Sequence, residues 1–206
     1  MATPQLTPQE IWTIKEDEIR KPTSAHIAVF ALLIGVGAVA GTFGSIAIPL
    51  GYGVTGFWPG VAVQAVGGIW FGMWGVLAGA LFPFISNSLA GAPLYVSVAY
   101  FPSNFIQGFL PAWVFRAFKV DPRLRTGKDW VHFIWSAVVV NNFLGALWAV
   151  TALQWFGLIT VASVPLFFSG WVIGNGVPAL VFGAILLKAL SPVVIRHRVF
   201  CKGWWA

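Results

Sequence analysis

Two long stretches without a formally charged residue constrain the fold of this chain more than any other feature. No Asp, Glu, Lys or Arg occurs from Pro22 to Phe115, or from Trp130 to Leu187. Soluble domains carry about a quarter charged residues, whereas 9% of this chain is charged and 58% is hydrophobic. So little polar surface cannot cover a water-facing globule. The sequence therefore predicts an all-α integral membrane protein, because helices satisfy their own backbone groups in lipid.

The remaining charges are gathered in three short clusters, which predict the topology. They precede, separate and follow the uncharged stretches, and the 12 Lys and Arg outnumber the 6 Asp and Glu. Short basic segments stay on the cytoplasmic side of a membrane, so the net charge of +6 indicates a cytoplasmic fringe and not a nucleic-acid surface. Three clusters on one side require an even number of crossings between each pair. We expect six transmembrane helices in the cell (plasma or inner) membrane, with both termini cytoplasmic.

The lengths of the two stretches assign the spans within a single membrane domain, residues 1–206. A crossing takes about 20 residues, so four spans fit in the first stretch and two in the second. We expect them at about 26–50, 57–73, 75–91, 94–117, 130–153 and 165–189, with cytoplasmic tails at 1–25 and 190–206. The joint between the second and third spans, residues 71–75 (Phe-Gly-Met-Trp-Gly), is uncharged and barely long enough for a turn, so a broken or re-entrant pair over 57–91 is the alternative. The N-terminal tail contains four acids, so we expect no cleaved signal peptide.

The N-terminal tail also contains a helix signal. Residues 7–10, Thr-Pro-Gln-Glu, form a capping box with Pro at the first helical position. Apolar residues then alternate with charges, at Ile11, Trp12, Ile14 and Ile19. This pattern predicts a short interfacial helix on the cytoplasmic leaflet. The alternative is a tail that only anchors the first span.

Small residues recur at helical spacing and indicate close helix packing. In lipid, helices associate through close backbone approach rather than the hydrophobic effect. A glycine stripe would run through the joint at residue 72 if that joint were helical, at Gly68, Gly72, Gly75 and Gly79. The first span carries a second set, and we expect it to dock a partner membrane subunit: Ala31, Gly35, Gly37 and Gly41.

Amide and aromatic side chains on four predicted spans suggest a shared ligand pocket. Polar groups inside a membrane often mark a site, and ligand pockets are apolar and aromatic with a few placed polar groups. We expect five side chains to orient a ligand: Asn104, Gln107, Asn141, Trp171 and Asn175. Three more would form stacking walls: Tyr100, Trp135 and Trp148. The alternative is that each amide only bonds a neighbouring helix.

Two adjacent amides, Asn141 and Asn142, interrupt the apolar run AVVVNNFLGALWA at 137–149. Neighbours on a helix point about 100° apart, so the two cannot face one point. Asn142 shares a face with small residues, including Gly145, which predicts a packing role. Asn141 lies beside Trp148, which predicts contact with the ligand.

Several classes of chemistry lack the residues they need. The three histidines, His26, His132 and His197, all flank predicted spans, and no His, Cys and acid cluster has metal-ligand spacing. The chain has no G-x-x-x-x-G-K-[ST] motif and no arguable Ser, His and acid set. We therefore expect neither an enzyme nor a bound cofactor or metal.

Two segments resemble known membrane proteins. Residues 57–117 run from FWPGVAVQAVGGIWFGMWGVLAGALFPFISNSLAG to SNFIQGFLPAWVFRA, and residues 170–192 read GWVIGNGVPALVFGAILLKALSP. The order is Trp-Pro, a glycine-rich hairpin, an Asn-containing helix ending in basic residues, and a final Trp-x-x-Gly helix. It resembles the substrate-binding S component of energy-coupling factor vitamin transporters, and the related membrane-associated sensor domain of bacterial histidine kinases and diguanylate cyclases.

The resemblance implies six helices, an outward-facing small-molecule pocket and a partner ATPase that acts through a coupling protein. The Ala-xxx-Ala docking motif of S components corresponds here to Ala31-xxx-Gly35 and Gly37-xxx-Gly41, and Asn175 stands where sensor domains often place an acid. No output domain follows residue 206 in this sequence, which favours the S component.

Three functions are consistent with these patterns. The first is a membrane substrate-binding and uptake subunit for a neutral or aromatic, vitamin-like small molecule. The alternative is a non-catalytic structural subunit of a larger membrane complex, in which the amides bond helices and the small-residue faces bind other chains. A ligand-sensing membrane domain is the third.

Overall fold

The computed structural model describes residues 6–206, and most of them are helical. The helices are α1 (Pro8–Trp12), α2 (Ser24–Ala47), α3 (Gly60–Phe71), α4 (Met73–Leu89), α5 (Leu94–Ala117), α6 (Gly127–Phe133), α7 (Asn141–Trp155), α8 (Val164–Pro178) and α9 (Ala184–Val194). A π-helical turn over Ile134–Val140 joins α6 to α7, another over Ala179–Gly183 joins α8 to α9, and a 3₁₀ turn over Val161–Ser163 precedes α8. Two short strands, β1 (Pro49–Gly51) and β2 (Val54–Thr55), pair antiparallel between α2 and α3.

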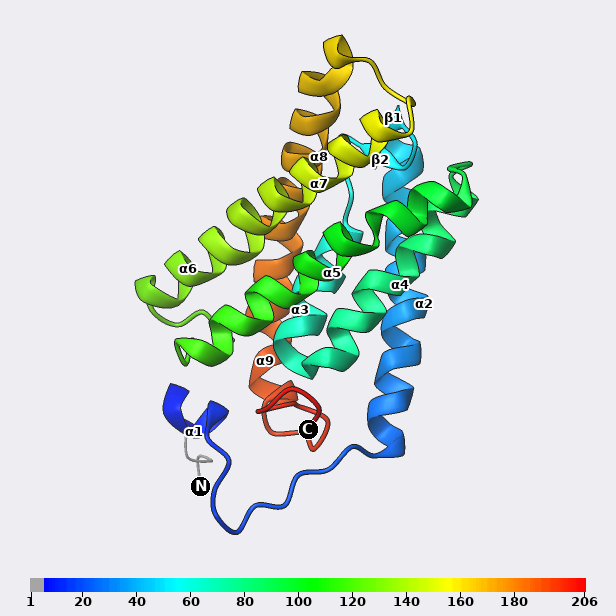
Figure 1. Ribbon diagram of the computed structural model, residues 1–206. Helices are drawn as coiled ribbons and strands as arrows, with labels where there is room; N and C mark the ends of the chain where they lie inside the picture. The colour runs from blue at the N-terminus through cyan, green and yellow to red at the C-terminus, as the bar shows by residue number, and fades with distance from the viewer. Residues whose placement is uncertain (1–5) are drawn as a thin grey trace.

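Each expected span lies on one helical stretch of the structure (Figure 1). α5 coincides with the expected 94–117, and the others begin and end within a few residues of their expected bounds. The helical prediction succeeds because uncharged, apolar runs of this length have few alternatives to a helix.

Three helical stretches of the described chain are long and apolar enough to cross a membrane. They are Ser24–Ala47 with 24 residues, Gly127–Trp155 with 29 and Val161–Val194 with 34. Helices α3 and α4 are apolar but shorter, with 12 and 17 residues. The chain is therefore a helical protein with three candidate membrane-spanning helices, which agrees with the predicted membrane class.

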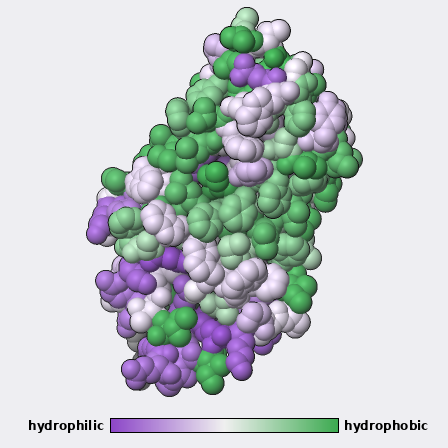
Figure 2. Space-filling view, viewed as in Figure 1, coloured by the Kyte–Doolittle hydropathy of each residue, from purple (hydrophilic) through white to green (hydrophobic). Residues whose placement is uncertain are grey.

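The two ends of the molecule differ in polarity. Helix α1, the start of α2 and the C-terminal segment that follows α9 lie at one end (Figure 1). Hydrophilic residues gather at this end, and hydrophobic residues cover much of the visible surface beyond it (Figure 2). We call it the charged end. The opposite end carries the β1–β2 segment and the connection between α7 and α8 (Figure 1).

Helices α3 and α4 form a hairpin that turns at Gly72. This residue ends α3 with φ 57°, a left-handed conformation that glycine adopts without strain. A Cβ on Gly75 would overlap the Gly67 carbonyl, so the two helices touch through their backbones. The glycines thus pack one helix on the other, and a continuous helical stripe through Gly72 is wrong. At a 1.5 Å rise per residue α3 is only about 18 Å long, shorter than a hydrocarbon core of about 30 Å.

The N-terminal helix α1 packs on the protein core. The predicted capping box is present, with Glu10 N donating to Thr7 Oγ1. Ile11 and Trp12 are 1% and 3% exposed, and Trp12 Nε1 donates to Val120 O at 2.7 Å. The short helix is therefore present where the sequence predicts it, and its apolar residues Ile11 and Trp12 pack against protein.

Candidate functional site

Three prolines inside helices determine where several polar side chains bond. Proline has no N–H, and its ring displaces the carbonyl four residues earlier, which loses its helical partner. Pro83 in α4, Pro111 in α5 and Pro178 in α8 each free one carbonyl in this way. At all three positions a group from another element donates to the freed oxygen.

The carbonyl freed by Pro83 sets the orientation of two amides. Gln64 Nε2 of α3 donates to the freed Gly79 O at 2.8 Å and also to Asn104 Oδ1 of α5 at 3.2 Å. Gln64 must present its NH₂ group to Gly79, so Asn104 must present its oxygen to Gln64. The Asn104 NH₂ group is then left without a protein partner.

The carbonyl freed by Pro111 is occupied by one of the adjacent asparagines. Asn141 Nδ2 of α7 donates to Gln107 O at 3.3 Å. The Gln107 side chain in turn donates through Nε2 to Asn142 Oδ1 at 2.8 Å. Both asparagines are 0% exposed. The two therefore contact the same residue of α5, one through its backbone and the other through its side chain.

The π-helical turn before α7 provides the acceptor for the side-chain NH₂ group of Asn142. A π-turn leaves carbonyls poorly matched to their helical partners, and Asn142 Nδ2 donates to Val138 O at 2.8 Å. The predicted packing role of Asn142 agrees with these bonds. The bond from Asn141 to Gln107 is also a bond between helices, so the predicted ligand contact of Asn141 has no support from its position.

The carbonyl freed by Pro178 fixes the segment before α3. Trp58 N donates to Gly174 O at 2.7 Å. The approach is close enough that a Cβ on Gly174 would overlap Thr55 O. Pro178 and Gly174 together hold the chain from β2 to α3 against α8.

A small cavity lies between this segment and helices α4, α5 and α8. Its volume is about 10 Å³, so in this conformation the cavity holds about one water molecule. Its lining combines backbone, aromatic and amide groups: Gly53, Val54, Thr55, Trp58, Pro83, Asn87, Tyr100, Asn104, Trp171 and Asn175.

Aromatic contacts hold the cavity walls in place. Trp58 stacks on Phe82 with ring centroids 5.7 Å apart. Tyr100 meets Trp171 edge to face at 5.2 Å, and Tyr100 Oη donates to Tyr52 O at 3.1 Å. The last bond ties α5 to the β1–β2 segment, so the cavity is covered from the end opposite the charged end.

Three buried hydrogen-bond donors on the cavity-lining side chains have no protein partner. They are Trp58 Nε1, Asn104 Nδ2 and Trp171 Nε1, on residues that are 5%, 2% and 6% exposed. The described chain also has unpaired buried acceptors on Gln64, Gln107 and Asn141, but none of these residues lines the cavity. Buried polar groups are normally bonded, so three unpaired donors on residues that line one cavity require an explanation.

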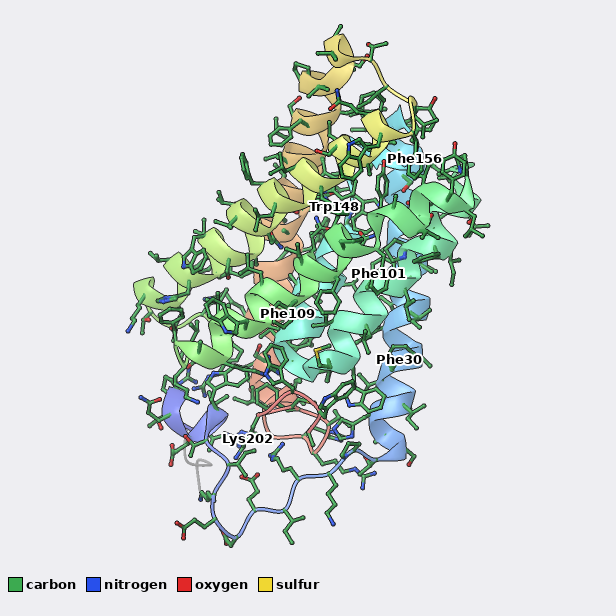
Figure 3. The ribbon with its side chains drawn as sticks, viewed as in Figure 1. Phe30, Phe101, Phe109, Trp148, Phe156 and Lys202 are labelled. Atoms are coloured by element: carbon green, nitrogen blue, oxygen red, sulfur yellow. The ribbon has the colours of Figure 1, made fainter. Side chains whose placement is uncertain are left out.

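Four of the eight predicted ligand residues line this cavity together: Tyr100, Asn104, Trp171 and Asn175. Gln107 and Asn141 are buried beside them without lining it. Trp135 and Trp148 lie elsewhere. Trp148 is 40% exposed, and its Nε1 donates to Ala99 O at 2.8 Å on the outer side of the bundle (Figure 3). A stacking role for these two tryptophans has no support from their positions.

Sequence reasoning did not assign two of the polar cavity residues, Trp58 and Asn87. Both carried a signal, since Trp58 begins the Trp-Pro pair and Asn87 lies in the Ser86-Asn87-Ser88 triplet. The contribution of the 53–55 segment could not be seen in advance, because a non-helical connection has no periodicity to place it.

The predicted docking residues separate onto two faces of α2. Gly37 and Gly41 are buried, and a Cβ at either would overlap Phe82 or Ser86 of α4. They pack α2 within the bundle, so a partner-docking role for these two glycines has no support from their positions. Gly35 has open space at its Cβ position, and together with Ala31 it lines a shallow apolar groove on the outer face of α2.

Ionisable groups with shifted pKa values occur at the charged end. Burial raises the pKa of Glu18, but hydrogen bonds from Lys202 and Arg20 outweigh it and bring the pKa to about 2. Burial raises the pKa of the Cys201 thiol to about 11. No formally charged residue lines the cavity, and within residues 6–206 no group of three His, Cys, Asp or Glu could hold a metal ion.

Comparisons with protein-family models, with curated proteins and with solved structures gave no match.

Proposed function

We propose that this protein is a membrane substrate-binding and uptake subunit for a neutral or aromatic, vitamin-like small molecule, energised by a partner ATPase. The observation that carries the proposal is the set of three unpaired donors on side chains that line one cavity. Unpaired buried donors each destabilise a fold by about 1–3 kcal/mol, and a ligand that accepts from them removes this cost.

The proposed topology has six crossings with both termini cytoplasmic. The six helical stretches alternate between the two ends, and α1, the C-terminal segment and the visible cluster of hydrophilic residues share one end. Helix α3 is too short to cross alone, and the non-helical segment 48–59 would complete its path. Irregular backbone is tolerated at membrane depth where protein buries it, and the cavity lies at this segment.

A vitamin-sized ligand requires the cavity to open, because ligand pockets usually measure about 300–1,000 Å³. Thr55 of β2 is fixed by its bond to Gly44 O of α2, whereas the turn before it is attached to α5 by the Tyr100–Tyr52 bond described above. We propose that this turn, residues 51–53, moves outward to admit the ligand.

The test is to purify the protein from its native membrane and identify what accompanies it. Mass spectrometry should find a small molecule, an ATPase and a coupling protein. The variant Asn104→Leu should lose the small molecule by at least tenfold and keep its fold. Trp148→Phe, which lies outside the cavity, is the control and should retain the molecule. An Asn104→Leu protein that retains the molecule would show that Asn104 only bonds helices.

The second candidate is a structural subunit of a membrane complex, and the exposed groove on α2 favours it. The groove is lined by Ala31, Leu32, Gly35, Val36, Val39 and Ala40, and exposed small residues allow another helix to approach closely. Co-purification of other membrane subunits in stoichiometric amounts, with neither an ATPase nor a small molecule, would support the structural role and reject the uptake function.

A further inference from the structure

We propose that the ligand of this cavity is a neutral, planar molecule that binds through carbonyl-type acceptors, and that donor-bearing cations are excluded. The inference rests on the proposed binding function and specifies the chemical class of ligand. It is drawn from the direction of the unpaired hydrogen bonds.

The orientation of the Asn104 side-chain amide is determined by α3, the helix that faces it. Pro83 removes the N–H that would bond Gly79 O, so Gln64 turns its NH₂ group to that oxygen. The same nitrogen bonds Asn104 Oδ1. An Asn104 flipped by 180° would place two NH₂ groups against each other, so its free group on the cavity wall is a donor.

The direction of the hydrogen bond is fixed at the two tryptophans, because an indole N–H can only donate. Trp58 Nε1 and Trp171 Nε1 are both without a protein partner. Gly145 of α7 packs closely beside one of these N–H groups, since a Cβ there would lie 3.2 Å from Trp171 Nε1.

The charge and the aromatic residues of the cavity lining restrict the class of ligand further. No Lys or Arg lines the cavity to balance a carboxylate, and no Asp or Glu lines it to balance an ammonium group. Burying an unpaired ion is far more costly than burying a hydrogen-bonded carbonyl. Three aromatic side chains, Trp58, Tyr100 and Trp171, line the cavity, which favours a planar aromatic molecule.

Four probes with one aromatic ring separate these properties. Acetophenone offers a neutral acceptor, benzoate an anionic acceptor, benzylammonium a cationic donor, and ethylbenzene no polar group. Binding is measured by equilibrium dialysis against the protein in lipid nanodiscs, with ethylbenzene and empty nanodiscs correcting for partition into lipid. We expect acetophenone to bind at least tenfold more tightly than each of the other three.

The variants Trp58→Phe and Trp171→Phe remove one N–H each and keep an aromatic wall. Each should weaken acetophenone binding about tenfold, a typical effect of losing one hydrogen bond, and leave ethylbenzene unchanged. Trp148→Phe, whose N–H bonds a carbonyl outside the cavity, should change neither. Unfolding temperatures of the three variants verify that the fold is intact.

The outcomes separate this inference from the proposed function. Tighter binding of benzylammonium or benzoate, or equal effects of all three Trp→Phe variants, would overturn the neutral-acceptor class while leaving uptake in place. A co-purifying small molecule combined with no binding of any probe would do the same. If nothing co-purifies and no probe binds, both proposals fail.

Discussion

Arg116, at the end of α5, shows at the scale of one residue how this fold holds a buried charge. Its guanidinium donates to four carbonyl oxygens, those of Gly68, Ala112, Cys201 and Gly203. The rings of Trp12 and Trp204 lie 5.0 and 5.2 Å from its centre. The planar fork of five N–H donors matches this task, and a lysine ammonium does not. One side chain thereby joins α1, the α3–α4 hairpin and the C-terminal segment.

Arg116→Lys is accordingly expected to destabilise the protein by about 2–3 kcal/mol, because buried carbonyls lose their donors. The C-terminal segment should also loosen, so Cys201, buried and with its pKa raised to about 11, should react faster with a maleimide. Thermal unfolding and labelling rates measure the two effects. Lys128→Met, an exposed position in the same basic cluster, is the control, and equal behaviour of the two variants would contradict this account.

At the scale of elements, helices are linked where prolines interrupt them. At three of the five prolines inside the described helices the freed carbonyl accepts from another element: Gly79 from α3, Gln107 from α7 and Gly174 from the segment before α3. The side-chain amides of Gln64 and Asn141 therefore form hydrogen bonds between helices, which is the role that the alternative interpretation of the sequence gives them. Only N–H groups that have no partner after this pairing can donate to a ligand.

A double-mutant cycle tests the pairing of Pro111 with Asn141. In the wild-type background Asn141→Leu leaves Gln107 O unpaired and should cost about 1 kcal/mol. In the Pro111→Ala background residue 111 regains an N–H that bonds Gln107 O, so the same substitution should cost about half as much or less. Equilibrium unfolding in mixed detergent micelles supplies the four free energies.

Asn142→Leu is the matched control for this cycle. Its bonds go to Val138 O and the Gln107 side chain, neither of which involves the carbonyl freed by Pro111. It should have the same cost in both backgrounds. Strictly additive effects of Pro111→Ala and Asn141→Leu would refute the proposed link.

For the whole molecule, the two tails are joined at the charged end. Lys202 Nζ lies 2.6 Å from Glu18 Oε2, and Arg20 Nε lies 2.7 Å from Glu18 Oε1. Arg20 also donates to Phe200 O at 2.6 Å. Lys202 is labelled in this region in Figure 3. These contacts hold residues 13–20 against residues 200–202, far from the cavity.

This junction should weaken in acid. The pKa of Glu18 falls from 4.5 to about 2 on folding, so its contribution to stability is complete above pH 4.5 and is lost as the pH falls toward 2. Glu18→Gln should remove this part of the pH dependence. Limited proteolysis of the N-terminal tail between pH 5 and pH 2 compares the two proteins. Parallel pH profiles would rule out the junction as the acid-sensitive contact.

The membrane class, the helix bounds and the identity of the polar residues followed from the sequence alone, because uncharged length and capping motifs are local properties. Which polar groups stay unpaired was decided only by the tertiary structure. Gly79 meets Gln64, and Gln107 meets Asn141, only after their helices pack. The same holds for α2, whose glycines look equivalent in sequence until packing buries Gly37 and leaves Gly35 open. A hydrogen bond between helices depends on both partners, so no single segment could reveal that the cavity wall is left with donors.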